Sequence, residues 1–476
     1  MPYETIIGLE IHIQLNTDSK AFCNDLNRFD DEANNNISHI SLAHPGTLPR
    51  MNKRHIEKAI KLGLAFNSQI NEFNFFDRKN YFYPDLPKGY QITQDKEPYC
   101  RSGFIRFISD GVVKSIRLHH IHMEEDAGKS IHDQNDSYTL VDYNRSGVPL
   151  LEIVTEPDFR SGQEVSDFMA ELQKVVQYLE ISDANMEEGS FRCDCNVSVR
   201  KIGDPKLGER CEIKNMNSRR YAKQAIEYEA IRQINILENG GIIQKTTMLF
   251  DPILGETRPM RKKESENDYR YFPEPDLPPI MIAEELLQRL KMESTTLPID
   301  LYLSFIEKYQ LSHADAELLT ESKETADYFK KGIEIGANPK DFCDLITNKL
   351  IPHAKKEKVS LIQLGNQNQI LAFLTFINGD KISKSAAYQH IFPEWIRDTD
   401  QDPEQIARTK NLLQSEDQSF LDELILNVMQ ANAPKVEEYR KGKKGLLGFF
   451  MGQVMQKSGG KADPKILQAK VEAALN

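Results

Sequence analysis

The period of the apolar pattern changes once along this chain, and that change limits the possible fold more than any other feature. Up to about residue 292 the sequence contains short β-rich runs at residues 5–15, 104–108 and 195–199, with helical patterns at 162–179 and 218–237. Beyond residue 292 nearly every segment repeats at helical spacing. Four prolines cannot continue regular structure and end the first part, at positions 273, 275, 278 and 279. The sequence therefore predicts an α+β part followed by an all-helical part.

The length predicts more than one domain. At roughly 150 residues per domain, 476 residues correspond to about three domains. A break rich in Asp, Gln and Pro at residues 398–404 divides the helical part. Ser312 and Asp463 are expected to cap helices in its two halves, with Pro464 at the first helical position of the last helix. The predicted domains are residues 1–292, 293–400 and 405–476.

Charge and cysteine content exclude several classes of protein. No apolar run approaches the roughly 20 residues of a membrane helix, and the first residues resemble no targeting segment, so we expect a cytoplasmic protein without a membrane partner. Six cysteines are scattered without a CxxC pair, which argues against a disulfide framework or a four-cysteine zinc site. The net charge of −12 opposes non-specific nucleic-acid binding by the whole chain, so basic regions must be considered locally.

Acidic residues stand at unusual places in the α+β part. In GLEIHI, a period of two puts Glu10 and His12 on one face of a strand, where a surface pair is the ordinary interpretation. Similar runs carry single acids among apolar neighbours, and carboxylates there are seldom buried without a partner. Together these acids favour a shared divalent cation over solvated surface charges. The candidates are Glu10, His12, Glu124, Glu125, Glu152, Asp194 and Glu212.

A nucleotide could bind beside these acids, although not through a P-loop. The string AGKS at residues 127–130 lacks the required glycine, because Met123 stands at that position, and the acids before it would repel phosphates. Phosphates are more plausibly held by Mg²⁺ on the carboxylates together with basic side chains. Candidate basic residues are Arg145, Arg192, Lys214, Arg261 and Arg270.

Two aromatic and basic segments, residues 78–90 and 268–279, have the composition of single-stranded nucleic-acid surfaces, although packed turn-rich loops look similar. Between residues 435 and 470 there are nine Lys or Arg and three acids, which favours a polyanion partner or a solvated basic face about equally. The candidate RNA contacts are Lys79, Tyr81, Lys88, Arg270, Lys441, Lys443, Lys444 and Lys457.

Several runs, in order along nearly the whole chain, resemble the B subunits of aspartyl/glutamyl-tRNA amidotransferases. They include GLEIHIQLNTDSKAFC, HMEEDAGKSIH, MEEGSFRCDCNVSVR, DYRYFPEPDLPP and GFFMGQVMQKSGGKADP. The resemblance implies a cradle-shaped domain with a mixed sheet, then an all-helical domain, then a small helical tail that contacts tRNA. It also implies ATP and Mg²⁺ as cofactors.

The family's activity would explain the acids. The resemblance implies that ATP activates the side-chain carboxylate of Glu-tRNA(Gln), Asp-tRNA(Asn) or both as an acyl phosphate, which ammonia then converts to the amide. It assigns metal-site positions to Glu10, His12, Glu125, Glu152, Asp194 and Glu212, with Glu124 added as a neighbour, and Glu125, Glu10 and His12 are the candidate catalytic residues. Arg192, Lys214 and Arg145 are the candidate nucleotide contacts.

Partners are expected because the chain has no amidase signature of the GGSSG type. The resemblance implies a separate amidase (A) subunit that supplies ammonia and a small C subunit, together forming a heterotrimer. Two departures from the family pattern stand out. Lys245 and Thr247 replace an acid and an arginine, and Cys23 stands where some relatives carry a cysteine cluster, so we expect no structural zinc.

Two other functions compete with this interpretation. The chain could present tRNA as a non-catalytic scaffold while its partners do the chemistry, a possibility that the clustered acids disfavour. It could also be an unrelated Mg²⁺-dependent ligase for small carboxylates, which would leave the basic tail unexplained.

Overall fold

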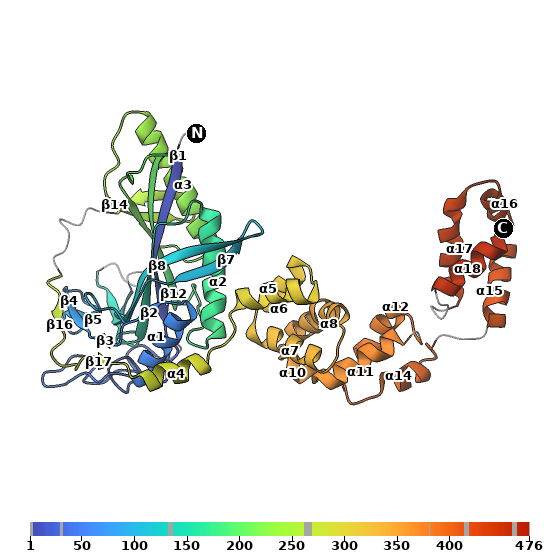
Figure 1. Ribbon diagram of the computed structural model, residues 1–476, viewed down its shortest axis with the longest axis horizontal. Helices are drawn as coiled ribbons and strands as arrows, with labels where there is room; N and C mark the ends of the chain where they lie inside the picture. Colours follow the sequence, from blue (N-terminus) through green and yellow to red (C-terminus); the bar gives the residue numbers. More distant parts are fainter. Residues whose placement is uncertain are drawn as a thin grey trace. The chain divides into compact units, whose positions relative to one another are not determined.

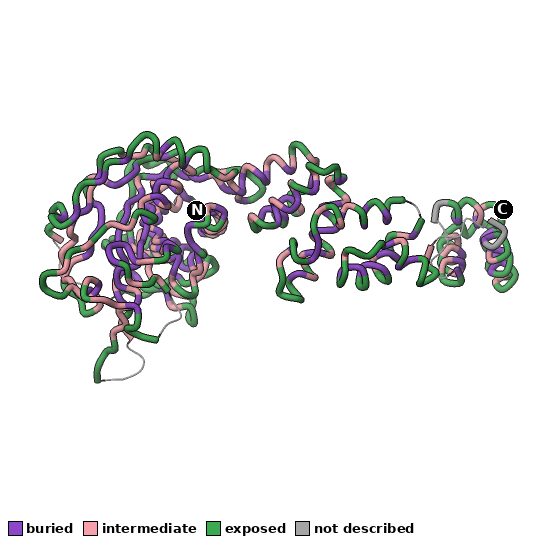
Figure 2. The backbone as a smooth tube through the Cα atoms, turned by 90° about the horizontal axis from the view of Figure 1, so that it is seen from below, coloured by how far each residue is buried: buried purple, intermediate pink, exposed green. Residues whose placement is uncertain are grey.

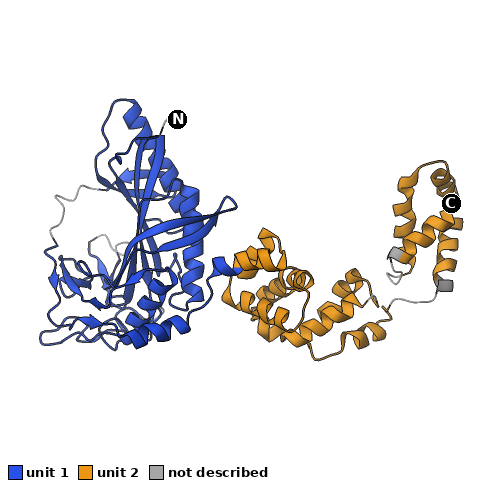
Figure 3. Ribbon diagram, in the orientation of Figure 1, with its two compact units in different colours: residues 1–301 blue, residues 302–476 orange. Residues whose placement is uncertain are grey.

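The computed structural model describes residues 3–28, 32–131, 137–260, 269–379, 381–413, 418–458 and 464–475. The chain divides into two compact units, residues 1–301 and 302–476 (Figure 3). The first unit combines a large mixed sheet with helices, and the second is helical in its described residues (Figure 1). The predicted α+β fold class, with helices after the sheet, is confirmed.

A ten-stranded sheet forms the centre of the first unit. Its order is β15-β14-β13-β12-β1-β11-β8-β6-β2, with β7 paired to β8, and only β13 and β14 run parallel. The strands of this sheet are β1 (Tyr3–Gln14), β2 (Gln69–Ile70), β6 (Cys100–Arg101), β7 (Phe104–Ser109), β8 (Val112–Glu125), β11 (Pro149–Thr155), β12 (Phe191–Lys201), β13 (Cys211–Lys214), β14 (Thr246–Asp251) and β15 (Glu256–Pro259).

Smaller sheets and helices complete this unit. A three-stranded sheet joins β16 (Phe272–Pro273), β4 (Asp77–Asn80) and β5 (Tyr90–Thr93), while β10 (Leu140–Asp142) pairs with β9 (Lys129–Ile131), and β17 (Ile280–Met281) pairs with β3 (Phe73–Asn74). The helices are α1 (Lys53–Ala65), α2 (Gly162–Tyr178), α3 (Arg219–Glu238) and α4 (Glu284–Met292), and α5 (Pro298–Tyr309) crosses the boundary between the units.

The two faces of strand β1 differ in chemistry. Leu9, Ile11 and Ile13 are buried in one apolar core with residues of α2 and α3, whereas Glu10 and His12 between them remain partly exposed. Helices α2 and α3 begin at serine N-caps, and their bounds agree with the predicted helices within one or two residues. Buried residues lie mainly inside this unit and exposed residues mainly on its outside (Figure 2). Because the apolar side chains of β1 pack on one face of the sheet, the other face is left for polar side chains.

The second unit contains only helices in its described part. Among the described residues, no helix is both long enough and apolar enough to cross a bilayer. The elements are α6 (His313–Thr320), α7 (Lys323–Glu334), α8 (Pro339–Leu345), η1 (Ile346–Leu350), α9 (Ile351–Glu357), α10 (Leu361–Leu364), α11 (Gln367–Asn378), α12 (Lys384–Ala386), η2 (Ala387–Ile391), α13 (Phe392–Trp395), α14 (Pro403–Thr409), α15 (Gln418–Ala431), α16 (Ala433–Arg440), η3 (Lys444–Leu446), α17 (Leu447–Lys457) and α18 (Pro464–Leu475).

Local sequence explains several features of these helices. Both π-helical segments, η1 and η2, come just before a proline, Pro352 or Pro393, whose missing N–H interrupts the regular hydrogen bonds. Ser312 caps α6 by accepting a hydrogen bond from the N–H of Asp315, as predicted. The last four helices enclose a separate apolar core that includes Val428, and α18 starts at Pro464. The predicted cap Asp463 lies outside the described residues.

Candidate active site

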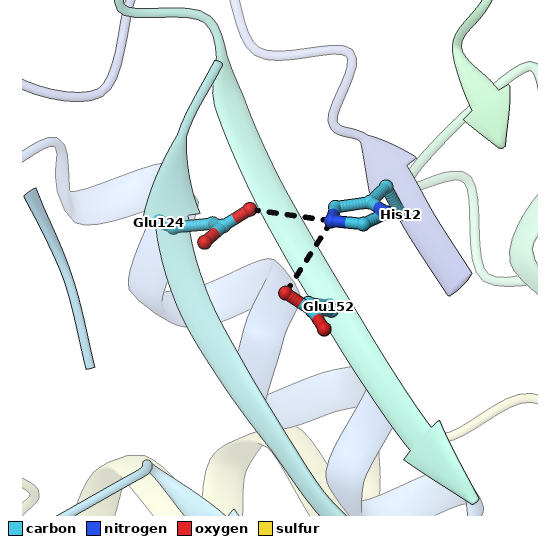
Figure 4. Close-up of side chains that lie close together, drawn as sticks. All are labelled: His12, Glu124 and Glu152. Atoms are coloured by element: carbon cyan, nitrogen blue, oxygen red, sulfur yellow. Dashed lines mark ion pairs between the residues drawn. The ribbon is translucent and has the colours of Figure 1, made fainter. Parts of the chain in front are cut away.

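Three side chains on the polar face of the large sheet meet at one point. The His12 Nε2 lies 3.3 Å from Oε2 of Glu152 and 3.7 Å from Oε1 of Glu124. Figure 4 shows the three side chains pointing toward one another from β1, β8 and β11. One ligand atom from each lies within 4.8 Å of the other two, which makes them a candidate set of metal ligands.

Strand order and register bring these residues together. Strand β11 lies between β1 and β8, and Glu152 faces His12 on one side and His122 on the other. Side chains two residues apart in a strand point to the same side, so Glu124 follows His122 onto this face. The convergence therefore results from antiparallel pairing between segments far apart in the sequence.

A second histidine, His122, joins this group and was not among the predicted site residues. Its Nε2 lies 3.2 Å from Oε2 of Glu152 and 3.3 Å from Oε2 of Glu124. The hydroxyl of Thr93 also donates a hydrogen bond to Glu124, at 3.1 Å. The available signal was the spacing of two between His122 and Glu124 in a strand-like run.

His12, His122, Glu124 and Glu152 form one cluster of charged side chains. The two glutamates favour the protonated, positively charged form of both histidines. Burial alone would lower the pKa of His122, but the charge of Glu152 and hydrogen bonds to both glutamates raise it to about 10. The pKa of His12 also rises, because its contact with Glu152 outweighs burial. Burial opposes ionisation of Glu152, yet the two histidines hold its pKa well below the ordinary value. Two carboxylates in this position attract a cation.

The other predicted acids on this face have partners of their own. Glu10 accepts a hydrogen bond from Asn196 at 3.0 Å, and burial followed by the charge of Glu152 raises its pKa. Asp194 faces Glu10 across the β1–β12 pair, and the ammonium of Lys214 lies 2.7 Å from Asp194 and 2.9 Å from Glu212. These acids share the face with the cluster, but within the described residues they are not part of the three-residue ligand set.

The carboxylate of Glu125 contacts residues outside the ligand set. Successive strand residues point to opposite sides, so Glu125 turns away from Glu124. Its carboxylate contacts the ammonium of Lys88 and accepts a hydrogen bond from the N–H of Ile92 at 3.0 Å. The structure does not bring Glu125 into the ligand set, and its predicted metal and catalytic roles stay predictions.

A cavity of about 510 Å³ is lined in part by Arg192, which lies opposite His12 in the pairing of β1 with β12. Arg192 Nη2 is 2.9 Å from Asp126, and Arg145 donates hydrogen bonds to the carbonyls of Ala127 and Gly128. Burial opposes ionisation of Asp126, but the two arginines hold its pKa below the ordinary value. Four basic and four acidic side chains line this cavity: Arg28, Lys129, Arg145 and Arg192, and Asp142, Glu187, Glu188 and Asp194. A predicted candidate, Arg261, lies outside the described residues.

The two aromatic and basic segments predicted separately lie side by side. Strand β4 pairs with β16, and the N–H of Asn80 donates to the carbonyl of Tyr269. The ammonium of Lys79 is 4.9 Å from the ring centre of Tyr269, which packs edge-on against Tyr81. Strand β4 also pairs with β5, whose Thr93 donates a hydrogen bond to Glu124, so this group lies close to the cluster. Arg270 adopts a left-handed backbone with φ of 43°.

Four predicted RNA contacts lie on the surface of the tail. Lys441 and Lys443 form exposed ion pairs with Glu437 and Glu438, at 3.6 and 3.0 Å. Exposed pairs of this kind contribute little and are readily exchanged for other anions. Two further lysines lie nearby in the chain: Lys444 over the ring of Tyr439, and Lys457, exposed at the end of α17.

The cysteines and the string at residues 127–130 were both considered as possible motifs in the sequence. The six cysteines are free, buried thiols. The string at residues 127–130 leads into strand β9, and Gly128 donates its N–H to the carbonyl of Asp85. A P-loop would place this string at the start of a helix, so its rejection agrees with the structure.

Comparison with known proteins identifies the family. The model of the GatB/GatE catalytic domain matches residues 5–288, and that of the GatB domain matches residues 327–475. Proteins named as the B subunit of aspartyl/glutamyl-tRNA(Asn/Gln) amidotransferase are similar over the whole length. Those of Thermodesulfovibrio yellowstonii and Chlorobaculum tepidum are 43% identical, over 98% and 100% of both chains respectively. That of Crocosphaera subtropica is 44% identical over 100% of this chain and 98% of its own. The chain therefore belongs to the family of aspartyl/glutamyl-tRNA(Asn/Gln) amidotransferase B subunits.

Proposed function

We propose that this chain carries the ATP-dependent step of transamidation, in which the side-chain carboxylate of Glu-tRNA(Gln), Asp-tRNA(Asn) or both is activated and converted to the amide. One observation carries the proposal. His12, Glu124 and Glu152 converge on a polar face of the sheet, and Arg192, which lies opposite His12 on β12, lines a neighbouring cavity. Carboxylates gathered in this way suit a cation that holds nucleotide phosphates.

The donor set fits a divalent cation. Carboxylate oxygens are the preferred ligands of Mg²⁺, and an imidazole nitrogen is tolerated by Mg²⁺ or Mn²⁺. When bound, the cation would neutralise negative charge on the phosphates of ATP. His12, Glu124 and Glu152 are the proposed ligands. Glu10, Asp194 and Glu212 are proposed as further acids of the same site, and Glu125, whose carboxylate contacts Lys88, is proposed to act without ligating the cation.

Basic side chains of the cavity are the proposed nucleotide contacts. Arg145 and Arg192 border the cavity next to Asp194, and Lys214 lies against Asp194. Arginine binds phosphate oxygens through paired N–H groups, whereas lysine acts as a point charge. The volume of about 510 Å³ lies within the 300–1,000 Å³ range of ordinary ligand sites.

The reaction requires positioning more than covalent chemistry by the protein. A carboxylate oxygen of the aminoacyl group attacks the γ-phosphorus of ATP, the bond to the bridging oxygen breaks, and ADP leaves. The nitrogen of ammonia then attacks the acyl carbon, and phosphate leaves with the former carboxylate oxygen. Holding the reacting groups together and neutralising charge are the contributions expected of this site.

We assign the acceptor end of the tRNA to the aromatic group beside the cluster. Unpaired bases stack on aromatic rings and lie next to basic side chains in single-stranded RNA sites. Lys79, Tyr81 and Tyr269 form such a group, and Lys88 and Arg270 are proposed to contribute nearby. The tail lysines would contact backbone phosphates of the tRNA body. They are Lys441, Lys443, Lys444 and Lys457.

Ammonia is proposed to come from a partner. The chain has no amidase signature, so a separate A subunit would hydrolyse glutamine, and a small C subunit would complete a heterotrimer in the cytoplasm. We propose three domains. Residues 1–292 carry out the chemistry, residues 293–400 form a connecting helical domain, and residues 405–476 bind tRNA.

ADP release tests this proposal. The purified complex is mixed with ATP and misacylated tRNA in the absence of glutamine, and we expect ADP release that depends on the misacylated tRNA. Glu152→Gln should abolish this release, because it removes a charge from the ligand set. Glu171→Gln is the matched control, since Glu171 is a buried carboxylate of α2 paired with Lys174 outside the site.

Each alternative function predicts a different result. A non-catalytic scaffold gives no change in ADP release on substitution of Glu152, because the chemistry would lie in its partners. A ligase for small molecules releases ADP without tRNA. Either outcome would contradict the proposal.

A further inference from the structure

The imidazole of His122 contacts both carboxylates of the candidate cation site. We propose that His122 is a positioning residue for this site, which holds Glu124 and Glu152 in the orientation that a divalent cation requires. The inference rests on the proposed function and adds a residue that neither the motifs nor the ligand set identified.

The two histidines contact different oxygens of Glu124 and the same oxygen, Oε2, of Glu152. His12 Nε2 meets Oε1 of Glu124, whereas His122 Nε2 meets Oε2 of the same carboxylate at 3.3 Å. His122 thereby holds one oxygen of Glu124 and leaves the other directed toward His12. The same nitrogen lies 3.2 Å from Oε2 of Glu152, so a single imidazole bridges both glutamates.

The His122 ring is itself held in place. It is buried, and its Nδ1 lies 3.2 Å from Nε2 of His120, whose ring stacks on it at 5.3 Å between centres. With Nδ1 directed to His120, Nε2 is the nitrogen left to donate to the carboxylates. Contacts at both ends of the ring therefore determine its orientation.

This arrangement predicts an effect on cation affinity. Carboxylates that bind metals are usually hydrogen-bonded by a second set of residues, and loss of such a residue weakens binding about 10- to 100-fold. Without His122, Glu124 would keep the hydroxyl of Thr93 as a donor. Among the described residues, His12 and His122 each contact both glutamates, and His122 is the one of the two that lies outside the ligand set.

Mn²⁺ binding to the purified complex, without nucleotide or tRNA, tests the inference. Electron paramagnetic resonance measures free Mn²⁺ during a titration. We expect His122→Ala to weaken binding about 10- to 100-fold. His122→Gln should restore most of the affinity, because its amide nitrogen can donate from nearly the place of Nε2. His390→Asn, at an exposed histidine of η2 in the second unit, is the control, and it should bind within about twofold of the unsubstituted protein.

Thermal unfolding without the cation separates positioning from folding. We expect His122→Ala and His122→Gln to unfold at similar temperatures while differing in Mn²⁺ affinity. Unchanged affinity in His122→Ala would overturn the inference, and so would equal losses of affinity in the Ala and Gln variants. If the unsubstituted protein binds no Mn²⁺, the cation site of the proposed function fails, and the inference fails with it.

Discussion

Replacing Glu152 by glutamine removes one negative charge from the candidate cation site and leaves the size of the side chain nearly unchanged. The carboxylate lies between two imidazoles, 3.3 Å from His12 and 3.2 Å from His122. It faces both histidines through the register of β11 with β1 and β8. The substitution therefore changes the charge at the centre of the site with little change in packing.

The magnitude follows from the charge removed. Two unit charges about 4 Å apart attract by about 4 kcal/mol at an effective dielectric constant of about 20, so one carboxylate provides a divalent cation with about 8 kcal/mol. Most of this is offset, because the carboxylate must give up contacts with His12 and His122 and because the glutamine oxygen can still bind. We expect a net loss of about 3 kcal/mol, which corresponds to roughly 100-fold weaker binding.

Calorimetric titration with Mn²⁺ measures this loss in the purified complex. Glu171→Gln, which removes a buried carboxylate from α2, serves as the control and should bind Mn²⁺ normally. If Glu152→Gln and the control bind Mn²⁺ equally well, Glu152 is not a ligand and the reasoning from its position is wrong.

Three further predictions follow from other contacts. Glu125→Gln should leave Mn²⁺ affinity within about threefold, because its carboxylate contacts Lys88 rather than the ligand set; a 100-fold loss in a titration would instead indicate direct ligation. Glu229→Gln should lower the free energy of unfolding by about 3 kcal/mol at pH 7, since Glu229 is fully buried and 2.7 Å from Arg232. Burial alone would raise the pKa of Glu229, but its hydrogen bonds hold it below the ordinary value. The contribution of Glu229 to the free energy of unfolding is therefore present above pH about 4.3 and should decrease as the pH falls below this value. Denaturant titrations at several pH values would measure this decrease. Replacing Lys441, Lys443 and Lys444 together by alanine should weaken tRNA binding and reduce the slope of log affinity against log salt by about 3. An unchanged slope in filter binding would exclude these contacts.

Local patterns in the sequence predicted the features that depend on neighbouring residues. The alternation around Glu10 and His12 determined that both lie on one face of β1, because side-chain direction follows directly from a period of two. Helix starts at Ser218 and Ser312 were also predictable, since a serine side chain caps the helix that follows it.

Features that depend on long-range pairing could not be predicted this way. The acids 124–126 look alike in the sequence, but strand β8 continues through Glu125, so alternation separates Glu125 from Glu124. His122 became part of the site only because β11 lies beside β8. The two aromatic segments were predicted as separate, and only the pairing of β4 with β16 shows that they form one group. Strand order is a property of the whole fold, and the local pattern does not contain it.

A crystal structure of the Mn²⁺-loaded complex, with the anomalous signal of manganese, tests the central claim most directly. The account predicts a peak within about 2.5 Å of His12 Nε2 and of carboxylate oxygens from Glu124 and Glu152. Manganese bound only elsewhere, with these three side chains still in contact with one another, would contradict it.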